Sequence, residues 1–300
     1  MPPARPPAPH GDDPVVYLDG RCLPKSRARI SPDDRGFLFG DGVYEVVRVI
    51  GGRMVDLDRH LARFARGASA LALALDRAGG VAGVREAWER LLGANGLTEG
   101  EALCYAQLTR GAAPRAHAYP AADTPPTLYA FAQRIAPPDA LRATGAAAVT
   151  YPDLRWARCD LKTVNLLPNV MARQAAAAAG AFESLLVRDG VVTEASHSSA
   201  FAVVGGTLRT HPLGTCVLPG VTRAAVLELA AGLGIPAREE AVTLEELRAA
   251  DEAFVASTTA DVMPVVTLDG APVGAGAPGP VARALGGAMA ARLGRAAAIR

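Results

Sequence analysis

Short apolar runs of β-prone residues alternate with two-residue turns along most of the chain. Asp-Gly or Gly-Gly pairs occupy five of these turns: Asp19-Gly20, Gly51-Gly52, Asp189-Gly190, Gly205-Gly206 and Asp269-Gly270. Both kinds of pair supply the positive φ angles that two-residue hairpins require. The pattern therefore predicts antiparallel sheets and argues against a doubly wound parallel sheet.

Apolar residues at helical spacing predict helices between these hairpins. In chain order, the expected stripes and segments are Leu61, Phe64, Ala68, Leu71 and Leu75; Val84, Ala87, Trp88, Leu91 and Leu92; Leu167, Val170, Met171, Gln174 and Ala178; Val226, Leu229, Ala230 and Leu233; and an Ala-rich segment from about Pro280 to Ile299. Asp58, Asn165 and Thr222 are expected to cap the first, third and fourth helices. Gly180 and Gly234 suit the ends of the third and fourth.

Two prolines, Pro137 and Pro138, mark the expected seam between two domains. We expect residues 1–13, which are rich in proline, to form a disordered tail. An N-terminal domain over residues 14–134, a linker over 135–140 and a C-terminal domain over 141–300 follow from this seam. The sequence thus predicts an α+β fold, with a small N-terminal α/β domain and a larger C-terminal domain of antiparallel strands flanked by helices.

Composition excludes several classes of function. Half of the residues are apolar and the formal net charge is +1, so a sizeable core can form while nothing attracts nucleic acid or an anionic membrane. The four cysteines have no metal-ligand spacing, and we expect unpaired thiols in a reducing cytoplasm. The N-terminus lacks the apolar segment of a signal peptide. A cytoplasmic protein without a metal site is expected.

Lysine is rare in this chain, since only Lys25 and Lys162 stand among 31 basic residues. An amine can lose its proton and attack a carbonyl, whereas a guanidinium group stays charged. Lys162 lies in the semi-apolar stretch RCDLKTVN, residues 158–165. It is therefore a candidate Schiff-base residue, with an ordinary surface cation as the alternative.

If Lys162 forms a Schiff base, pyridoxal 5′-phosphate is the expected carbonyl partner, and it makes three demands. The first is a carboxylate for the ring nitrogen. Glu194, at the end of a predicted hairpin strand, could supply it, although an exposed strand-end carboxylate is the commoner situation. The second is a phosphate site at a helix start. Val221 and Thr222, in the turn LPGVTR, could supply it, with a plain helix cap as the alternative.

Further hydroxyl and arginine side chains could complete the phosphate site. Ser257 and Thr258 follow a predicted strand, and Arg63 lies off the apolar stripe of the first helix, where it could reach a phosphate or lie in water. The third demand is a clamp for the substrate carboxylate. Arg115 and His117 are two residues apart, so in an extended loop their side chains point the same way. A solvated loop is the alternative.

Seven blocks of sequence together resemble the class IV (fold type IV) pyridoxal-phosphate aminotransferases, and most closely their D-amino-acid transaminase branch. The blocks, in the order that the family has them, are RGFLFGDGVYEVVRV from Arg35, DRHLARF from Asp58, TRGAAPRAHAYP from Thr109, RWARCDLKTVNLLPNV from Arg155, VVTEASHSSAFAV from Val191, THPLGTCVLPGVTR from Thr210 and FVASTTADVMPV from Phe254. The resemblance covers the chain from about Val15 to Arg295. It implies a two-domain fold type IV enzyme.

The resemblance also implies a role for each matching residue. Lys162 would carry the cofactor and shuttle the substrate proton, and Glu194 would pair with the pyridinium nitrogen. Arg63, Thr222, Thr258 and the backbone of Val221 would hold the phosphate. Tyr44 would face the substrate carboxylate together with Arg115 and His117. In this family the loop with the Arg-x-His pair comes from the partner subunit, so a homodimer is implied.

The implied reaction is a ping-pong transamination between a D-amino acid, such as D-alanine or D-glutamate, and a 2-oxo acid such as pyruvate or 2-oxoglutarate. Branched-chain L-aminotransferases and aminodeoxychorismate lyases share the lysine and the glutamate but generally lack the Arg-x-His loop; both remain alternatives, as does a non-catalytic protein that kept the fold. One departure is Ala195-Ser196-His197-Ser198-Ser199, where the family often has Gly-Ser-Ser-Ser-Asn. The effect of this departure on the reactivity of the cofactor, and so on the rate, stays open.

Overall fold

The computed structural model describes residues 13–295, and the chain clusters into two compact units. Unit 1 contains the described residues up to Ala136 together with Lys162–Asn165, and unit 2 contains Pro137–Leu161 and the described residues from Leu166. The stretch that carries Lys162 thus clusters with unit 1, although its neighbours in the chain belong to unit 2. Apart from Asp13, the tail predicted for residues 1–13 lies outside the described residues.

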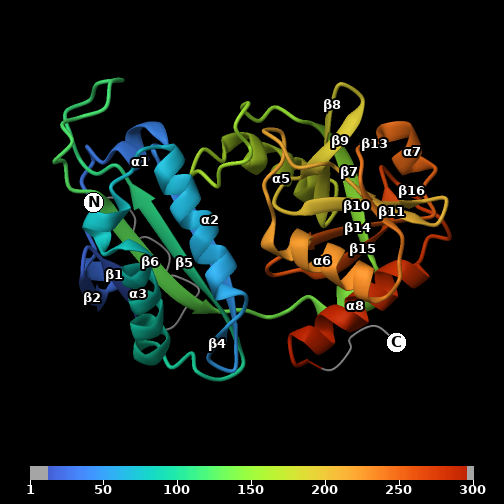
Figure 1. Ribbon diagram of the computed structural model, residues 1–300, viewed down its shortest axis with the longest axis horizontal. Helices are drawn as coiled ribbons and strands as arrows, with labels where there is room; N and C mark the ends of the chain where they lie inside the picture. The colour runs from blue at the N-terminus through green and yellow to red at the C-terminus, as the bar shows by residue number, and fades with distance from the viewer. Residues whose placement is uncertain (1–12, 296–300) are drawn as a thin grey trace, which may run out of the picture. The chain divides into compact units, whose positions relative to one another are not determined.

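Unit 1 is built on a six-stranded antiparallel sheet in the order β2-β1-β6-β5-β3-β4 (Figure 1). The strands are β1 Val15–Leu18, β2 Arg21–Pro24, β3 Gly42–Ile50, β4 Arg53–Met54, β5 Glu101–Thr109 and β6 Thr127–Arg134. Side chains of β5 alternate between buried and half-buried along the strand. This period of two is the pattern of a sheet with one face on a core.

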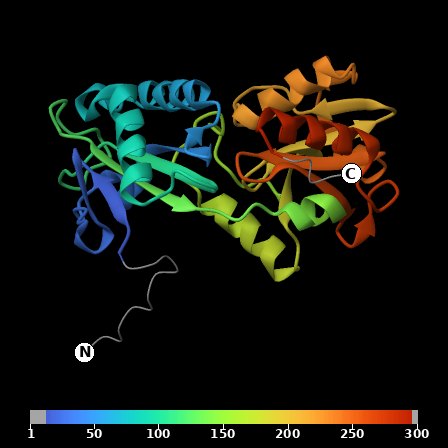
Figure 2. The same cartoon turned by 90° about the horizontal axis from the view of Figure 1, so that it is seen from below.

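Helices α2 Leu57–Ala70 and α3 Gly80–Ala94 pack on one face of this sheet, as Figure 2 shows. Unit 1 also contains α1 Arg35–Phe39 and two short 3-10 turns, η1 Lys25–Arg27 and η2 Leu75–Ala78. Phe64 and Trp88 are fully buried, and the indole Nε1 of Trp88 donates to the carbonyl of Tyr105 at 3.0 Å. The stripe predicted for α3 and the residues Leu61, Phe64 and Ala68 of the first stripe are therefore core contacts of this unit. The first helix is shorter than predicted, because α2 ends at Ala70 and Leu75 lies in η2.

Unit 2 is built on a ten-stranded mixed sheet in the order β12-β11-β10-β14-β15-β7-β8-β9-β13, with β16 paired to β15. The strands are β7 Ala146–Pro152, β8 Glu183–Arg188, β9 Val191–Ala195, β10 Ser199–Val204, β11 Thr207–Thr210, β12 Ala237–Glu239, β13 Val242–Thr243, β14 Glu252–Ser257, β15 Asp261–Leu268 and β16 Ala271–Pro272. The pairs β7–β8, β7–β15 and β11–β12 are parallel. The other pairs are antiparallel.

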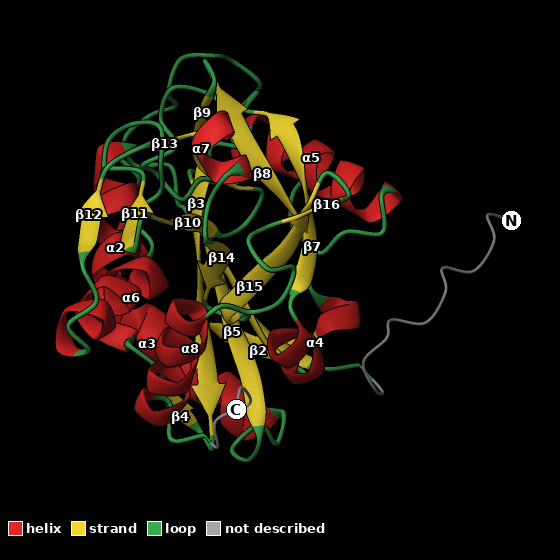
Figure 3. Cartoon of the chain, turned by 90° about the vertical axis from the view of Figure 1, so that its right-hand side faces the viewer, coloured by secondary structure: helices red, strands yellow, loops and turns green. Residues whose placement is uncertain are grey.

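Helices flank the second sheet, as the colouring by secondary structure in Figure 3 shows. They are α4 Asp139–Thr144, α5 Leu167–Ala178, α6 Val221–Gly232, α7 Leu244–Arg248 and α8 Pro280–Arg292. α5 packs on β7 and β8, whereas α6 and α8 pack on β14 and on each other. The end of the last predicted helix, Ile299, lies outside the described residues. Between residues 13 and 295, no helix combines the length and the apolar character that crossing a bilayer demands.

All five predicted hairpin turns are confirmed. They join β1 to β2, β3 to β4, β8 to β9, β10 to β11 and β15 to β16, and all ten turn residues have positive φ. The predicted antiparallel character holds for these consecutive strands. The parallel pairs arise where a longer connection returns the chain to the sheet, as α5 does between β7 and β8, and such pairs leave no turn signal.

Three predicted helix caps are wrong by one or two positions. α2 begins at Leu57, so Asp58 lies inside its first turn. α5 begins after Asn165, whose amide is engaged elsewhere. The cap of α6 is Gly220, so Thr222 is already helical. In each case a polar residue near the helix start was read as the cap, because first turns and caps favour the same residue types.

The apolar stripe predicted for α5 does not face the core. Leu167, Val170 and Met171 are 70%, 59% and 46% exposed, whereas Ala172 and Ala176 are fully buried. The small alanines let α5 approach β7 and β8 closely, and this contact turns the larger side chains outward. The prediction is wrong because side-chain size at the contact, rather than hydrophobicity alone, selected the buried face.

Candidate active site

Strand β3 brings Tyr44 to Lys162 within unit 1. The amide of Tyr44 donates to the carbonyl of Lys162 at 2.9 Å, and Val43 forms a β-bridge with Thr163. The Nζ of Lys162 lies 4.2 Å from the centroid of the Tyr44 ring, and both side chains are half-buried. The lysine is thus held by its own backbone beside an aromatic face, with its amine partly shielded from water.

Arg63 does not lie in water, because it is locked to a buried carboxylate of β3. Its Nε and Nη2 donate to the two oxygens of Glu45 at 2.8 and 2.6 Å, and the Nδ1 of His60 lies 3.0 Å from the same carboxylate. Burial alone would raise the pKa of Glu45, but the charge and hydrogen bonds of Arg63, with those of His60, hold that pKa well below its usual range. The guanidinium is therefore fixed in orientation.

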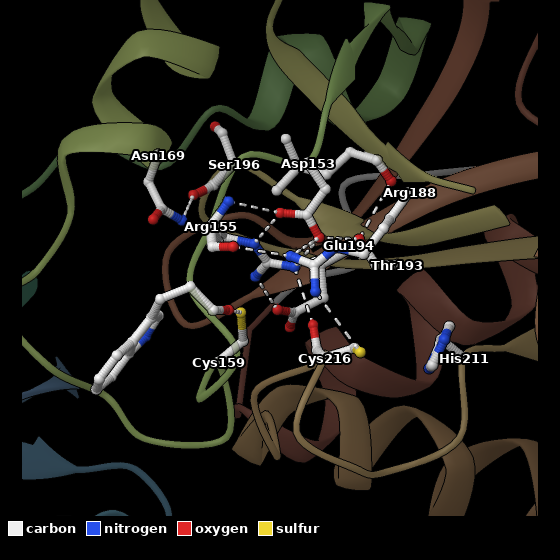
Figure 4. A network of polar contacts seen from close by, with 12 residues as sticks. Asp153, Arg155, Cys159, Asn169, Arg188, Thr193, Glu194, Ser196, His211 and Cys216 are labelled. Atoms are coloured by element: carbon white, nitrogen blue, oxygen red, sulfur yellow. Dashed lines mark hydrogen bonds and ion pairs between the residues drawn. The ribbon is translucent and has the colours of Figure 1, made fainter. Parts of the chain in front are cut away.

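A buried ion network surrounds Glu194 in unit 2 (Figure 4). The Nη1 of Arg155 donates to Oε2 of Glu194 at 2.5 Å. The same guanidinium donates from Nε and Nη2 to the two oxygens of Asp153, at 2.8 and 2.9 Å, and from Nη2 to the carbonyl of Cys216 at 3.0 Å. Arg188 lies 3.2 Å from Asp153. Two carboxylates are thus balanced by two guanidinium groups.

The two carboxylates of this network differ in their electrostatics. Burial raises the pKa of Glu194, and the nearby charge of Arg155 opposes that rise without cancelling it. Burial acts on Asp153 in the same direction, but its hydrogen bonds and charge contact with Arg155 prevail and lower its pKa to about 2. Asp153 therefore stays ionised, whereas the pKa of Glu194 lies above its usual value.

The start of α6 has the features of an anion site. Gly220 is its cap, and no described side chain accepts from the N–H groups of the first turn. These groups have no partner inside the helix, and the helix dipole favours an anion there. Val221 and Thr222 are the first two helical residues. A Cβ added to Gly220 would lie 2.9 Å from the Oγ of Ser199, so the turn has no room for a larger residue.

Ser257 and Thr258 lie where β14 ends, and both are half-buried. The Oγ of Ser257 accepts from the amide of Ala260 at 3.2 Å, which uses one lone pair of the hydroxyl and leaves its proton available to an acceptor. The structure thus assigns Ser257 a role in closing a turn. Its predicted contact with a phosphate stays a prediction, as does that of Thr258.

Arg115 and His117 lie on the exposed loop between β5 and β6. Their side chains flank one ring: the guanidinium of Arg115 lies 5.1 Å from the centroid of Phe39, and the imidazole of His117 lies 5.7 Å from it. Both residues are exposed. Within the described part of unit 1, no contact joins this pair to Lys162 or Tyr44. The structure therefore brings the pair together on one aromatic ring.

The residues present fit pyridoxal 5′-phosphate. Unit 1 offers a half-buried primary amine beside an aromatic ring and an oriented guanidinium. Unit 2 offers a buried carboxylate with a raised pKa and a helix start that suits a phosphate. These are the groups that the aldehyde, the phosphate and the ring nitrogen of the cofactor require. Lys162 and Glu194 would hold its aldehyde carbon and its ring nitrogen.

Sequence reasoning missed the residues that hold these groups in place. Asp153 and Arg155 fix Glu194, while Glu45 and His60 fix Arg63. Part of this was visible, since His60 and Arg63 are three apart and must share a helix face. The contact between Arg155 and Glu194 joins residues 39 positions apart, and no local pattern reports such a pairing.

Comparisons with known proteins agree with this chemistry. The family model for amino-transferase class IV matches residues 42–268. The chain is 42% identical over 269 residues to the D-alanine aminotransferase of Bacillus licheniformis, covering 89% of this chain and 93% of that protein. It is 38% identical over 270 residues to the D-alanine aminotransferase of Staphylococcus aureus (strain MSSA476), covering 90% and 94%.

Solved structures show the same fold. The branched-chain amino acid aminotransferase of Escherichia coli superposes with a TM-score of 0.85 at 23% identity, over 93% of this chain and 94% of that one. The branched-chain aminotransferase of the archaeon Thermoproteus uzoniensis, solved with norvaline, gives 0.82 at 26% identity, over 95% and 96%. Other branched-chain aminotransferase structures carry a phosphopyridoxyl group or pyridoxamine 5′-phosphate, and class IV aminotransferases use pyridoxal phosphate. This chain belongs to the class IV aminotransferase family and has its two-domain fold type IV architecture.

Proposed function

We propose that this protein transfers the amino group of a D-amino acid, such as D-alanine, to a 2-oxo acid such as pyruvate or 2-oxoglutarate. The observation that carries the proposal is its likeness to D-alanine aminotransferases over about nine-tenths of both chains. The paired Arg115 and His117 support it, because a guanidinium and an imidazole on one exposed loop suit a carboxylate.

When bound, pyridoxal phosphate supplies an aldehyde that takes up the amino group and a ring that delocalises the electrons of the substrate Cα–H bond. Lys162 accepts the α-proton of the substrate at Nζ and later gives the proton back, so it acts first as a base and then as an acid. Glu194 holds a proton at the ring nitrogen, and Arg155 keeps its carboxylate in place. Tyr44 lies beside the Lys162 amine and limits its access to water.

The remaining predicted site residues bind either the phosphate of the cofactor or the carboxylate of the substrate. Arg63, held by Glu45, and the first turn of α6 at Val221 and Thr222 bind the phosphate, with Thr258 and the Ser257 hydroxyl as further donors. Arg115 and His117 bind the substrate carboxylate. This division leaves Lys162 as the one group that moves a proton at the substrate.

The half-reaction tests this proposal most directly. Protein loaded with pyridoxal phosphate is mixed with D-alanine or L-leucine without an acceptor, and the absorbance of the bound pyridoxal form is followed. We expect loss of that absorbance with D-alanine and none with L-leucine. Lys162→Ala is the control, and we expect it to fold and to be inert. Loss with L-leucine alone would favour a branched-chain L-aminotransferase, and pyruvate released from aminodeoxychorismate would favour a lyase.

We further propose a homodimer in which the loop of one subunit serves the site of the other. The exposed Arg115 and His117, which do not contact Lys162 of their own chain, support this arrangement. The exposed apolar side chains on α5 are a second feature that self-association would cover. A cytoplasmic location is also proposed, and the four free thiols accord with it.

Mixing two inactive variants tests the exchange of loops. Lys162→Ala keeps the loop, and Arg115→Ala keeps the lysine. If the loop acts in the partner, each mixed dimer has one intact site, and random reassortment restores about a quarter of all sites. If the loop acts within its own chain, the mixture stays inactive. The mass of the unmodified protein in solution, by light scattering, shows whether it is a dimer at all.

A further inference from the structure

The loop that carries Arg115 and His117 leaves the sheet through a narrow neck. Gly111 has φ +87°, and a Cβ added there would lie 1.9 Å from the carbonyl oxygen of Pro125, where the loop returns. The amide of Arg35 donates to the carbonyl of Gly111 at 2.9 Å, and Asp34 forms a β-bridge with Ala112. The start of α1 is thus joined to the neck of the loop.

Beneath this neck, two buried arginines share one carboxylate. The Nε of Arg35 and the Nε of Arg110 both donate to Oδ2 of Asp41 at 2.8 Å, and the Nη2 of Arg110 donates to Oδ1 at 3.0 Å. Arg35 and Arg110 are only 3% and 8% exposed. Burial raises the pKa of Asp41, but the two guanidinium groups outweigh it and lower that pKa. The aspartate is therefore ionised and holds both cations in fixed orientations.

Both arginines also hold the loop, Arg35 through the end of its guanidinium that is turned away from Asp41 and Arg110 through a cation–π contact. The Nη1 of Arg35 donates to the carbonyl of Ala116 at 2.6 Å, and its Nη2 lies 3.5 Å from the carbonyl of His117. The guanidinium of Arg110 lies 3.5 Å from the ring centroid of Tyr119. The bonded carbonyl of Ala116 thus stands between Arg115 and His117 in the chain.

Arg35 restrains the loop backbone at the carbonyls of Ala116 and His117, while the side chains of Arg115 and His117 stay exposed. Residues 114–119 are all exposed, so the loop tip adds nothing to the core. Burying an arginine under an exposed loop is unfavourable unless every donor is paired. Arg35 contacts the carbonyls of Ala116 and His117, so the backbone between Arg115 and His117 has a fixed direction. The direction of the backbone determines where the side chains of Arg115 and His117 point. What the buried arginines provide is orientation of the two side chains, rather than burial of apolar surface.

We propose that Arg35, held by Asp41, is a positioning residue for substrate recognition: it sets the loop so that Arg115 and His117 meet the substrate carboxylate together. The inference rests on the proposed function for the roles of that pair. Since amino acid and 2-oxo acid present the same carboxylate, Arg35 affects the binding of both. It leaves the bound cofactor and the proton transfer at Lys162 unchanged.

Steady-state kinetics of Arg35→Met test the proposal. We expect the KM of D-alanine and of the 2-oxo acid to rise about tenfold or more, with kcat within about twofold of the unmodified protein, as loss of uniform binding predicts. Affinity for pyridoxal phosphate, measured by fluorescence titration, should not change. Arg35→Lys keeps a charge near Asp41 but cannot form the fork, so we expect an intermediate KM. This second variant, checked by thermal melting, also serves if Arg35→Met does not fold.

The matched control is Arg134→Met. Arg134 also donates to two backbone carbonyls of a loop in unit 1, at Glu99 and Gly96, but that loop carries no predicted site residue. We expect both KM values to stay unchanged in this variant. A tenfold rise of the KM values in Arg134→Met would overturn the inference. The loss of any arginine contact with a loop carbonyl in unit 1 would then have the same effect as the loss of Arg35.

Limited digestion with trypsin gives a readout that needs no turnover. The bond after Arg115 is exposed, but the carbonyl of the next residue, Ala116, is held by Arg35. We expect the peptide ending at Arg115 to appear at least about fivefold faster in Arg35→Met than in Arg134→Met, because opening of a restrained loop limits cleavage. Equal rates would overturn the inference.

The two readouts separate the inference from the proposed function. Faster cleavage with unchanged KM values would overturn the inference, because the loop would be anchored without serving the substrate. An unmodified protein that turns over no D-amino acid would instead refute the proposed function, and would remove with it the role of Arg35 in recognition. Faster cleavage together with raised KM values for both substrates supports the proposal.

Discussion

Replacing Arg155 by methionine removes the cation between two buried carboxylates. Asp153 and Glu194 are 8% and 6% exposed, and Arg155 is bonded to both of them. In the variant, Asp153 keeps Arg188 at 3.2 Å, whereas Glu194 loses its guanidinium partner. Methionine fills a similar volume, so the change tests charge pairing more than packing.

The expected loss of stability is large. Removing one partner of a buried pair typically costs about 3–5 kcal/mol, because the remaining charge stays buried without compensation. For a chain of this size each kcal/mol lowers Tm by roughly 2–4 °C, so we expect a decrease of about 6–20 °C. Unfolding in urea without cofactor, followed by circular dichroism, measures the free energy.

The loss should depend on pH with a definite sign. Burial already raises the pKa of Glu194, and Arg155 opposes this rise, so the variant raises that pKa further. A folded state that holds a proton more tightly than the unfolded state is favoured below the raised pKa and disfavoured as pH rises through it. The deficit of Arg155→Met relative to the unmodified protein should therefore be smaller near pH 5 than near pH 8, to an extent of about 1 kcal/mol or more.

Arg158→Met is the matched control for this prediction. Arg158, three residues further along the chain, pairs with Asp160 at 2.9 Å, but its side chain is 46% exposed. Exposed pairs contribute about 0–1 kcal/mol, so this variant should unfold almost as the unmodified protein does. If Arg155→Met loses less than about 1 kcal/mol at both pH values, or loses more in acid, the assignment of Glu194 as a buried charge that needs Arg155 is refuted.

Three further predictions concern single residues. Glu45→Gln should weaken binding of pyridoxal phosphate about tenfold in a fluorescence titration, because Arg63 loses the charged partner that orients it; unchanged affinity would exclude that role. Gly111→Ala should lower Tm by several degrees, because φ +87° is strained for alanine and its Cβ would meet Pro125; a melt within a degree of the unmodified protein would contradict this. Thr243→Ala removes a capping box and should lose about 1 kcal/mol in urea unfolding, with kcat unchanged.

Local chemistry made the hairpins predictable. Asp189-Gly190 and the four other pairs each join strands that are adjacent in the chain, so the turn residues themselves report the structure. The parallel pairing of β7 with β8 was not predictable in this way, because the connection passes through α5 and no residue at either strand marks its partner.

Helix faces were predictable only where large apolar residues do the packing. In α3, Trp88 and Leu91 are fully buried as the spacing predicts. In α5, Ala172 and Ala176 face the sheet, and Val170 faces outward. Hydrophobic spacing identifies a stripe, but close approach of a helix to a sheet selects small residues, and a sequence in which alanine is common on every face does not show which stripe is used.

The candidate reactive groups left signals in the sequence, whereas the groups that hold them did not. Lys162 was a candidate because lysine is rare in this chain, and Glu194 because an acid stood at the end of a β-prone run. Arg155 was not, since arginine is common here and nothing local distinguishes a buried one. Its role follows from two carboxylates that approach it from different strands and loops, which is information that only the folded chain contains.

Among the described residues, the same device recurs at three places where the arginine side chain is less than a tenth exposed. Arg63 donates two hydrogen bonds to Glu45, Arg110 donates two to Asp41, and Arg155 donates two to Asp153. A planar fork that meets both oxygens of a carboxylate fixes position and rotation at once, which a lysine ammonium cannot do.

In two of these networks, an arginine that is paired with the carboxylate also donates a hydrogen bond to a second group. Arg155 uses Nη1 for Glu194, and Arg35, which shares Asp41 with Arg110, uses Nη1 for the loop. A buried ion pair adds little net stability, because desolvation offsets the attraction. Its benefit here is orientation, since a group that is already held loses less entropy when it binds a ligand. Under the proposed function, arginine thus supplies the rigid framework of the candidate site, and Lys162 is the residue that moves the proton.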